Sequence, residues 1–553
     1  MTTRTLRFLI LCSLSGALSA QDLLPTPRFP DASYFRQTFN REIPKVDLLP
    51  PARLQDFVAN GKLELSLRSY IDLVLANNTE MQVTRLSVET FRNNITRAFG
   101  RFDPVVTTSF TATRDTQQST SVLEGATNPS SLSQPFRFSY DQLLDSGTRY
   151  SVGFNALKSS SNNAFATFNP AITSNFQINF TQPLLRDRGR YINRLQIAVA
   201  RSRFRQSEYN TQDNLLRLLQ FAETAYWNVI DARESLRVQE GGLKVASEIL
   251  ERNKKELQLG AISALDIFQP QQSYATQEVA VTTARYRLQQ TEDALRRQIG
   301  ADLDPSFRNM PIELTESVLP PTDDRPLDRE AHVELAYRHR PDLKSTLQAL
   351  DIDDLTYKQA QNRLLPDFAL TGTYNSKGLG GNFIPRTNDL GTGVRLTNQL
   401  IPGGLGDALE NVFAFRFPTY TMGITLRLPL RDRAAQADLA DATVNKRLNA
   451  LRARSAEQTI RQDVLNAVTD VESARASVRL AGVALDFAQK RLDAENKKYE
   501  LGLLTIFFLV QAQQDLVRAQ ADLVSNSVRY RRSQLNLLRM TGTLLEERGV
   551  ALQ

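Results

Sequence analysis

One stretch occurs twice in the chain, and it constrains the fold more than any other feature. Residues Leu218–Gly260 and Ile460–Gly502 begin 242 residues apart, and in both copies apolar side chains recur at alternating steps of four and three. Only Gln239 and Asn253 interrupt the first series, and only Glu495 interrupts the second. A 3.5-residue repeat held over this length favours long helices in a left-handed supercoil. Because a second helical pattern follows each terminal Leu-Gly pair, the sequence predicts two long antiparallel coiled-coil hairpins.

The rest of the chain also repeats. In each half a helix comes first, then strand-like stretches, and then the long hairpin, whose first helix is expected to begin near Asp187 in the first half. The opening helix of the second half should break at Arg340-Pro341, because proline suits the first position of a new helix. The resulting division is a signal peptide at 1–20, a proline-rich arm at 21–64, repeat 1 at 65–300, a proline-rich linker at 301–327, repeat 2 at 328–543 and a C-terminal tail at 544–553.

The first twenty residues have the pattern of a secretory signal. Arg4 and Arg7 precede an apolar centre, and small residues at the end permit cleavage after Ser19 or after Ala20. The only cysteine, Cys12, lies inside this segment, and the large Leu11 before it does not fit a lipoprotein signal. The mature protein is therefore expected to be exported and to contain no thiol.

Four stretches alternate with period two, at residues 105–113, 175–181, 367–374 and 419–428. One face of each carries Phe, Ile, Leu, Tyr or Met, and the other carries mainly Thr, Ser, Asn or Gln. This alternation is typical of a transmembrane barrel around a watery lumen, although a half-buried soluble sheet gives the same pattern. Four strands cannot enclose a wet lumen, so several chains would have to supply strands together; a trimer supplying twelve would give a lumen and no open edges. Residues 136–154 either add to such a barrel or form an external hairpin. The fold class is thus α+β, mainly α.

Short motifs then match a known family. The chain resembles the TolC-like outer-membrane channels, also called outer-membrane efflux proteins, in the order, spacing and duplication of segments that cover nearly all of the mature chain. These segments are Arg340–Leu343, Gln182–Arg186, Arg433–Ala437, Leu259–Ser263 and Leu501–Thr505. The resemblance implies a homotrimer in the outer membrane of a Gram-negative cell, with a twelve-stranded β-barrel continued by an α-helical barrel across the periplasm. The arm would then be periplasmic, and lipid would surround the strands.

The resemblance also implies a function and partners. The chain would be the exit duct of a tripartite efflux or type I secretion system. The tips of its hairpins would dock a periplasmic adaptor (membrane fusion) protein, which links the duct to an inner-membrane transporter. The transported substrate and the class of that transporter are left open. The alternative is a periplasmic coiled-coil adaptor or scaffold that never enters a membrane.

The hairpin tips are the first candidate site. Gly260 and Gly502 allow a tight reversal, and Ser263 and Thr505 suit the caps of the return helices. These segments are turns in either case, and the resemblance implies that they also form the adaptor-docking surface. The residues assigned to it are Leu259, Gly260, Ala261, Ser263, Leu501, Gly502, Leu503 and Thr505.

A periplasmic gate is the second candidate site. By resemblance, Asp266 and Tyr499 would hydrogen-bond between neighbouring hairpins and hold the entrance closed. Phe508 and Gln511 stand where the best-known family pattern has two acidic residues that narrow the pore. A Phe508 ring would make an apolar constriction that gates by dewetting; alternatively, the ring packs between helices.

Other functional classes find little support. The only histidines, His332 and His339, have no acidic or thiol partner at metal-ligand spacing, so neither a metal site nor a cofactor is expected. No phosphate-binding loop or nucleophile with a base is present, so we expect no enzyme. The net charge of +7 is spread along the chain without a basic block, which argues against nucleic acid. Trp227, the sole tryptophan, is expected to serve packing.

Overall fold

The computed structural model describes residues 53–120, 125–163, 165–260, 262–319, 326–389, 393–396, 399–501 and 503–550. For residues 386–389 and 393–396 it describes the backbone alone. These residues belong to one compact unit, Leu48–Gln553. The predicted signal peptide and most of the predicted arm lie outside the described residues, as do Ala261 and Gly502.

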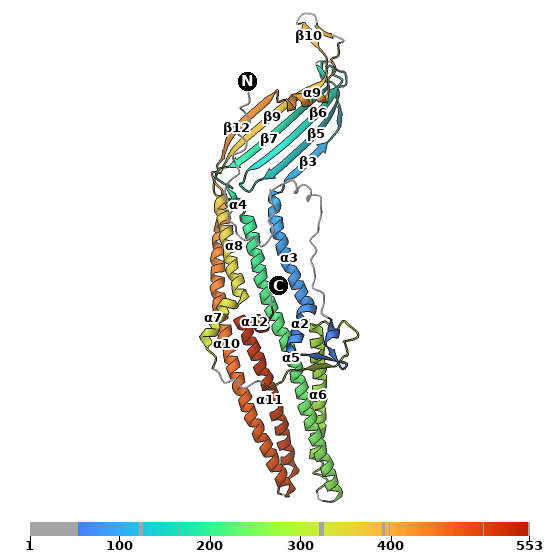
Figure 1. The fold of residues 1–553 in the computed structure, drawn as a ribbon, viewed down its shortest axis with the longest axis vertical. Helices are drawn as coiled ribbons and strands as arrows, with labels where there is room; N and C mark the ends of the chain where they lie inside the picture. The colour runs from blue at the N-terminus through green and yellow to red at the C-terminus, as the bar shows by residue number, and fades with distance from the viewer. Residues whose placement is uncertain are drawn as a thin grey trace. The chain divides into compact units, whose positions relative to one another are not determined.

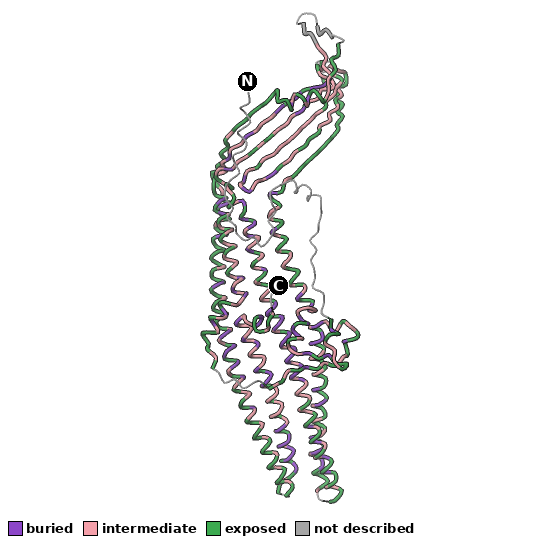
Figure 2. Tube along the Cα trace, in the orientation of Figure 1, coloured by how far each residue is buried: buried purple, intermediate pink, exposed green. Residues whose placement is uncertain are grey.

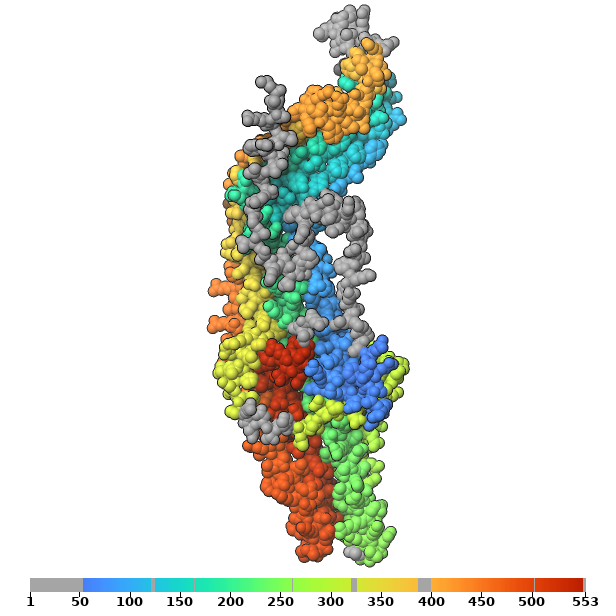
Figure 3. Space-filling model, in the orientation of Figure 1, coloured from blue at the N-terminus to red at the C-terminus, as the bar shows by residue number. Residues whose placement is uncertain are grey.

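Two long helical hairpins dominate this unit (Figure 1). The first pairs α5 (Leu195–Gln258) with α6 (Phe268–Gln298), and the second pairs α10 (Arg433–Glu500) with α11 (Ile506–Thr541). α5 has 64 residues and α10 has 68, which at 1.5 Å per residue gives about 100 Å each. The tips of the two hairpins lie at the same end, where the space-filling view shows them side by side (Figure 3). The predicted hairpins are therefore present, although α5 begins eight residues later than expected.

Shorter helices complete each half. The N-terminal helix of repeat 1 divides at Asn78, whose side chain accepts hydrogen bonds from the backbone of Glu80 and Met81 and so caps the second segment. In repeat 2 the division falls at Arg340-Pro341, as predicted, with Pro341 at the first position of the new helix. The segments are α2 (Leu67–Asn77), α3 (Thr79–Phe99), α4 (Arg190–Asn193), α7 (Arg329–His339), α8 (Pro341–Arg363), α9 (Leu405–Phe413), α12 (Leu544–Glu547) and the 3-10 turns η1 (Leu54–Phe57) and η2 (Gly100–Phe102).

The duplication extends to the helix ends. Both return helices are followed by a left-handed glycine, Gly300 with φ +70° and Gly542 with φ +76°, and these two glycines are 242 residues apart. At Gly542 an added Cβ would lie only 2.9 Å from the backbone carbon of His339. This position therefore needs glycine both for its φ angle and for the close approach of α7.

A small three-stranded sheet covers the first hairpin. It consists of β1 (Val58–Ala59), β2 (Lys62–Leu65) and β8 (Ile312–Leu314), with β8 parallel to β2. Apart from Leu65, these residues fall in the predicted proline-rich arm and linker, where no strands were expected. The strands are too short to show a period of two, but Leu63, Leu65 and Leu314 bury their side chains against α5. The largest buried cluster, purple in Figure 2, lies under this sheet and includes Tyr70, Tyr226, Trp227, Ile230, Leu295 and Ile299.

The chain end is fastened to this core by a buried ion pair. Arg548 donates to both carboxylate oxygens of Glu223, at 2.7 and 3.0 Å, and the Glu223 side chain is only 2% exposed. Trp227 donates its indole N–H to the same carboxylate at 3.3 Å, and the Arg531 guanidinium lies over its ring. Trp227 thus lies in the core, and the predicted tail packs on the helices through Leu544 and Leu545.

The main sheet lies beyond the opposite ends of the long helices from the tips (Figure 1). Its strands are antiparallel in the order β12-β9-β7-β6-β5-β3, and β4 also pairs with β5. The bounds are β3 (Val105–Phe110), β4 (Thr113–Thr116), β5 (Ser130–Leu143), β6 (Arg149–Ser161), β7 (Phe168–Pro183), β9 (Asp367–Phe383) and β12 (Pro418–Arg427). A separate hairpin pairs β10 (Arg386–Asp389) with β11 (Gly393–Leu396).

All four predicted strands are in this sheet, but the expected number of main strands was too low. Residues 136–154, whose placement the sequence left open, form the β5–β6 hairpin, and these two strands lie within the sheet, between β7 and β3. The alternation of Phe136, Phe138 and Tyr140 was visible in the sequence. Its Ser-rich surroundings did not reveal which strands it would pair with.

Candidate functional site

The main sheet has two chemically different faces. Residues directly opposite one another on paired strands share a face, so the register sorts the side chains of all strands into two sets. One face is apolar, with Val106, Phe110, Phe136, Phe138, Tyr140, Val152, Phe154, Phe176, Ile178, Phe180, Tyr374, Tyr420, Met422, Ile424 and Leu426. The other face is polar, with Thr107, Ser109, Ser139, Ser151, Asn155, Asn175, Gln177, Asn179, Thr371, Thr373, Asn375, Thr419, Thr421 and Thr425.

The apolar face remains open to the surroundings in the single chain. On the edge strand β12, Tyr420 is 73% and Met422 is 76% exposed, and the strand is green along most of its length in Figure 2. Soluble proteins rarely expose an apolar patch of this extent. The face is therefore suited to contact lipid or another chain. Among the described residues, none of the helices is long and apolar enough to cross a membrane.

A short amphipathic helix, α9, lies on part of the apolar face. The hydroxyls of Ser174 and Ser376 donate to the carbonyls of Ala408 and Val412, at 2.9 and 2.7 Å. At Gly378 an added Cβ would lie 1.9 Å from the Ala408 carbonyl oxygen, so only glycine allows the helix to lie this close. No helix was expected in the Gly-rich stretch 376–417. The spacing of Leu405, Ala408 and Val412 was the signal that could have revealed the helix.

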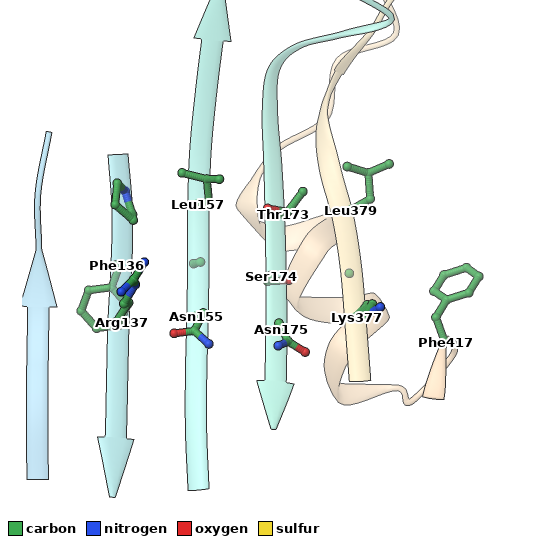
Figure 4. Close-up of a pocket in the computed structure, with 13 residues that line it drawn as sticks. Phe136, Arg137, Asn155, Leu157, Thr173, Ser174, Asn175, Lys377, Leu379 and Phe417 are labelled. Atoms are coloured by element: carbon green, nitrogen blue, oxygen red, sulfur yellow. The ribbon is translucent and has the colours of Figure 1, made fainter. Parts of the chain in front are cut away.

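The polar face contains an open hollow across four strands (Figure 4). Arg137, Asn155, Asn175 and Lys377 form one registered row across β5, β6, β7 and β9. Leu157, Thr173 and Leu379 lie beside this row, and none of the residues that line the hollow is acidic. The side-chain oxygen of Asn175 is buried without a hydrogen-bond partner. The row thus places two cationic and two amide side chains on the polar face of the sheet.

The hairpin tips expose apolar side chains. Leu259 is 84% exposed, and Leu501 and Leu503 are each 73% exposed. Gly260 has φ +73° and makes the predicted reversal. Thr505 occupies the cap position of α11 without a side-chain cap bond. Ser263 was wrongly predicted as a cap: α6 begins at Phe268, and the Ser263 hydroxyl accepts from the backbone of Leu265 instead.

Behind the tips, Tyr499 connects the two hairpins. Its hydroxyl donates to Glu256 at 2.8 Å and lies 3.3 Å from the side-chain oxygen of Asn253. The Arg252 guanidinium lies 5.1 Å from the ring centroid and donates to the same Glu256 carboxylate. Burial, followed by the hydrogen bond to Glu256 and its negative charge, raises the pKa of the Tyr499 hydroxyl to about 12. Tyr499 is therefore a neutral donor near pH 7.

This contact corrects one predicted detail of the gate. The Asp266–Tyr499 hydrogen bond expected from the sequence does not form within the chain. Asp266 accepts from the backbone N–H of Ser263 at 3.1 Å, which closes the turn of its own tip. Glu256, on the last turns of α5, takes the place expected for Asp266. The sequence does contain the signal, because Asn253 and Glu256 lie one turn apart on the helix that faces Tyr499.

Phe508 and Gln511 lie on the first turns of α11. Phe508 is 48% exposed and meets Phe507 edge to face, with ring centroids 5.5 Å apart. Gln511 donates to Asp515 at 3.1 Å, and Arg491 also binds Asp515. About half of the Phe508 ring is thus uncovered by its own chain, in a position where it could project into a pore or pack against another copy.

The two histidines are apart from these sites. His332 contacts the backbone carbonyl of Asp328, and His339 lies 3.3 Å from Glu546. Within the part of the chain that the structure describes, no cluster of three or more potential ligands could hold a metal ion.

Comparison with known proteins gives consistent results. The family model described as outer membrane efflux protein matches residues 70–301 and 333–543. The chain is 23% identical to the outer membrane protein TolC of Escherichia coli over 329 residues, and 24% identical to the outer membrane efflux protein BepC of Brucella suis over 339 residues. Each alignment covers 60% of this chain and spans 62% of the relative's length. The fold is similar to that of the CmeC outer membrane channel of Campylobacter jejuni, with a TM-score of 0.58, 17% identity and coverage of 96% of this chain and 95% of CmeC.

Proposed function

Because the chain belongs to the outer membrane efflux protein family, we propose that it forms the trimeric outer-membrane exit duct of a tripartite efflux or type I secretion system. The duct passes substrates from an inner-membrane transporter across the periplasm and the outer membrane. The sheet lies in the outer membrane, and the helical hairpins extend into the periplasm.

The observation that carries this proposal is the two-faced sheet attached to paired coiled-coil hairpins. Its apolar face contacts lipid and its polar face lines a watery lumen, which is the arrangement that a membrane barrel requires. The exposed edge strand β12 argues against the alternative of a soluble periplasmic scaffold, which would need its apolar face covered.

The hairpin tips dock a periplasmic adaptor through their exposed leucines. The gate is formed behind them by Tyr499 and its partners, with Phe508 and Gln511 at the constriction and Asp266 bracing the first tip. Because Leu259 and Leu503 are more than 70% exposed, replacing either by Asp should weaken adaptor crosslinking without unfolding the protein. Val279→Asp is the matched control, at an apolar site farther along α6 that is 67% exposed.

The first test is single-channel conductance of the detergent-purified protein in planar bilayers, together with its mass in solution. A species of three chains with discrete conductance supports the duct. A soluble species that never inserts would refute it and favour the scaffold. Oligomers in the outer-membrane fraction of cells provide the corresponding test in vivo.

A further inference from the structure

The main sheet contains more than the four strands per chain that a twelve-stranded trimeric barrel would use. Six strands lie side by side in it, from β12 to β3. We propose that all six enter the wall, so that three copies close an eighteen-stranded barrel in which the β5–β6 hairpin is an integral part. This inference rests on the proposed trimeric channel and specifies the number of strands in its barrel.

The register of the β5–β6 hairpin makes it part of the sheet. β5 pairs with β6 from Ser131 to Leu143, and β6 pairs with β7 from Arg149 to Ser159. On its other side β5 pairs with β3. A hairpin outside the wall would leave β3 and β7 as neighbours, whereas here the two strands are separated by β5 and β6 along their length.

The apolar and polar faces of the sheet continue across β5 and β6. On β5 and β6 the apolar set contains Phe138 and Phe154, which lie opposite each other and in the same cross-strand row as Phe176 of β7. The polar set contains Ser139 and Asn155, in line with the polar residues of the neighbouring strands. An external hairpin exposed to water would not need an apolar face that continues that of the wall.

The two edges of the sheet are suited to pair between copies. β3 and β12 are the two end strands of the sheet, and every residue of β3 and nearly every residue of β12 is exposed. Since all neighbours in the sheet are antiparallel and the strands are even in number, the end strands run in opposite directions. β12 of one copy can therefore pair antiparallel with β3 of the next, which removes both edges.

The consequence is a wider duct. Barrel diameter grows roughly linearly with strand number, so eighteen strands give a barrel about 1.5 times as wide as twelve and about twice the cross-section. Within the sheet, the Arg137–Lys377 row would then line a pore able to admit bulkier cargo than a twelve-stranded barrel.

Electron cryomicroscopy of the full-length protein in lipid nanodiscs tests the inference directly, because it counts the strands. Engineered disulfides in cells give a second readout, since the only native cysteine lies in the predicted signal peptide. Ser151→Cys with Asn179→Cys, and Thr107→Cys with Ser139→Cys, join directly opposed residues and should oxidise. Thr107→Cys with Gln177→Cys is the control; it spans three strand spacings, about 14 Å, and should stay reduced.

A shortened variant measures the effect on conductance. Replacing residues 117–167 with a Gly-Ser linker removes β5 and β6 and leaves β3 and β7 free to pair antiparallel. Its single-channel conductance should fall by up to about twofold, the factor by which the pore area of the barrel falls, because the gate adds resistance in series. A conducting trimer with twelve strands, in which only the control pair oxidises, would overturn this inference and leave the proposed function intact. A full-length protein that neither trimerises nor conducts would overturn both.

Discussion

The hydrogen bond between Tyr499 and Glu256 gives the sharpest prediction. Tyr499→Phe removes one hydroxyl and leaves the ring against Arg252 in place. A hydrogen bond to a charged group contributes about 1.5–3 kcal/mol, and the partial exposure of this pair favours the lower end, about 1.5 kcal/mol. Since 1.4 kcal/mol is about tenfold in an equilibrium constant, loss of the bond should raise the ratio of open to closed hairpins about tenfold in each chain.

The assay is the open probability of single channels at pH 7, with Tyr286→Phe as the control. Tyr286 is 64% exposed on α6 and undergoes the same chemical change without joining the hairpins. Because the folded pKa of Tyr499 is raised to about 12 from 10, its contribution is complete below pH 10 and is lost as the pH rises toward 12. The effect of the mutation should therefore be equal at pH 7 and pH 9. An unchanged open probability in Tyr499→Phe would refute the assignment of this contact to the gate.

Three further predictions concern the core, the polar face and α9. Arg548→Ala leaves a buried carboxylate without its cation and should lower the free energy of unfolding by about 3 kcal/mol, measured by thermal or denaturant unfolding. Charge reversal of Arg137 and Lys377 to Glu should lower the chloride-to-potassium permeability ratio severalfold, because cations lining a pore favour anions; reversal potentials measure this. Gly378→Ala places a methyl group against the α9 backbone and should destabilise the protein by about 1–3 kcal/mol, again measured by unfolding.

Each of these has a matched control. Arg479→Ala removes an exposed arginine and should change stability by less than about 0.5 kcal/mol. Glutamine at both positions of the basic row should give an intermediate ion selectivity, and an unchanged ratio in both variants would show that the row does not line the pore. Gly406→Ala adds a methyl group within α9 where no atom lies within 4 Å. If it destabilised the protein as much as Gly378→Ala, close packing of α9 on the sheet would not be the cause.

The sequence predicted the features that repeat over many residues. The heptad pattern of α5 and α10 and the glycine at each predicted hairpin tip are local signals, and the duplication shows each of them twice. The alternation of β7, β9 and β12 is similarly local. Both kinds of pattern survive in the structure because a long helix or strand must keep one face consistent along its whole length.

The features that depended on contacts between distant segments could not be predicted. β2 and β8 pair across some 250 residues and are too short to have a period. α9 is specified as much by Ser174 and Gly378 on the strands beneath it as by its own sequence. Tyr499 makes a polar contact between the hairpins, with Glu256 in place of Asp266. The partner depends on how α5 packs against α10, which no local pattern encodes.

The length of α5 makes its far end a lever. The helix is held in the main core at Ile230 and continues without a break to Gln258, a distance of about 42 Å at 1.5 Å per residue. A rotation of about 5° at the core would therefore displace the tip by about 4 Å, more than the length of a hydrogen bond. Tyr499 and Glu256 lie near the end of this lever arm, beside the small apolar cluster around Leu509, so a few contacts oppose a force applied with the greatest mechanical advantage. A partner that pulls on the tips thus needs only a small force to turn α5 about the core and part the hairpins.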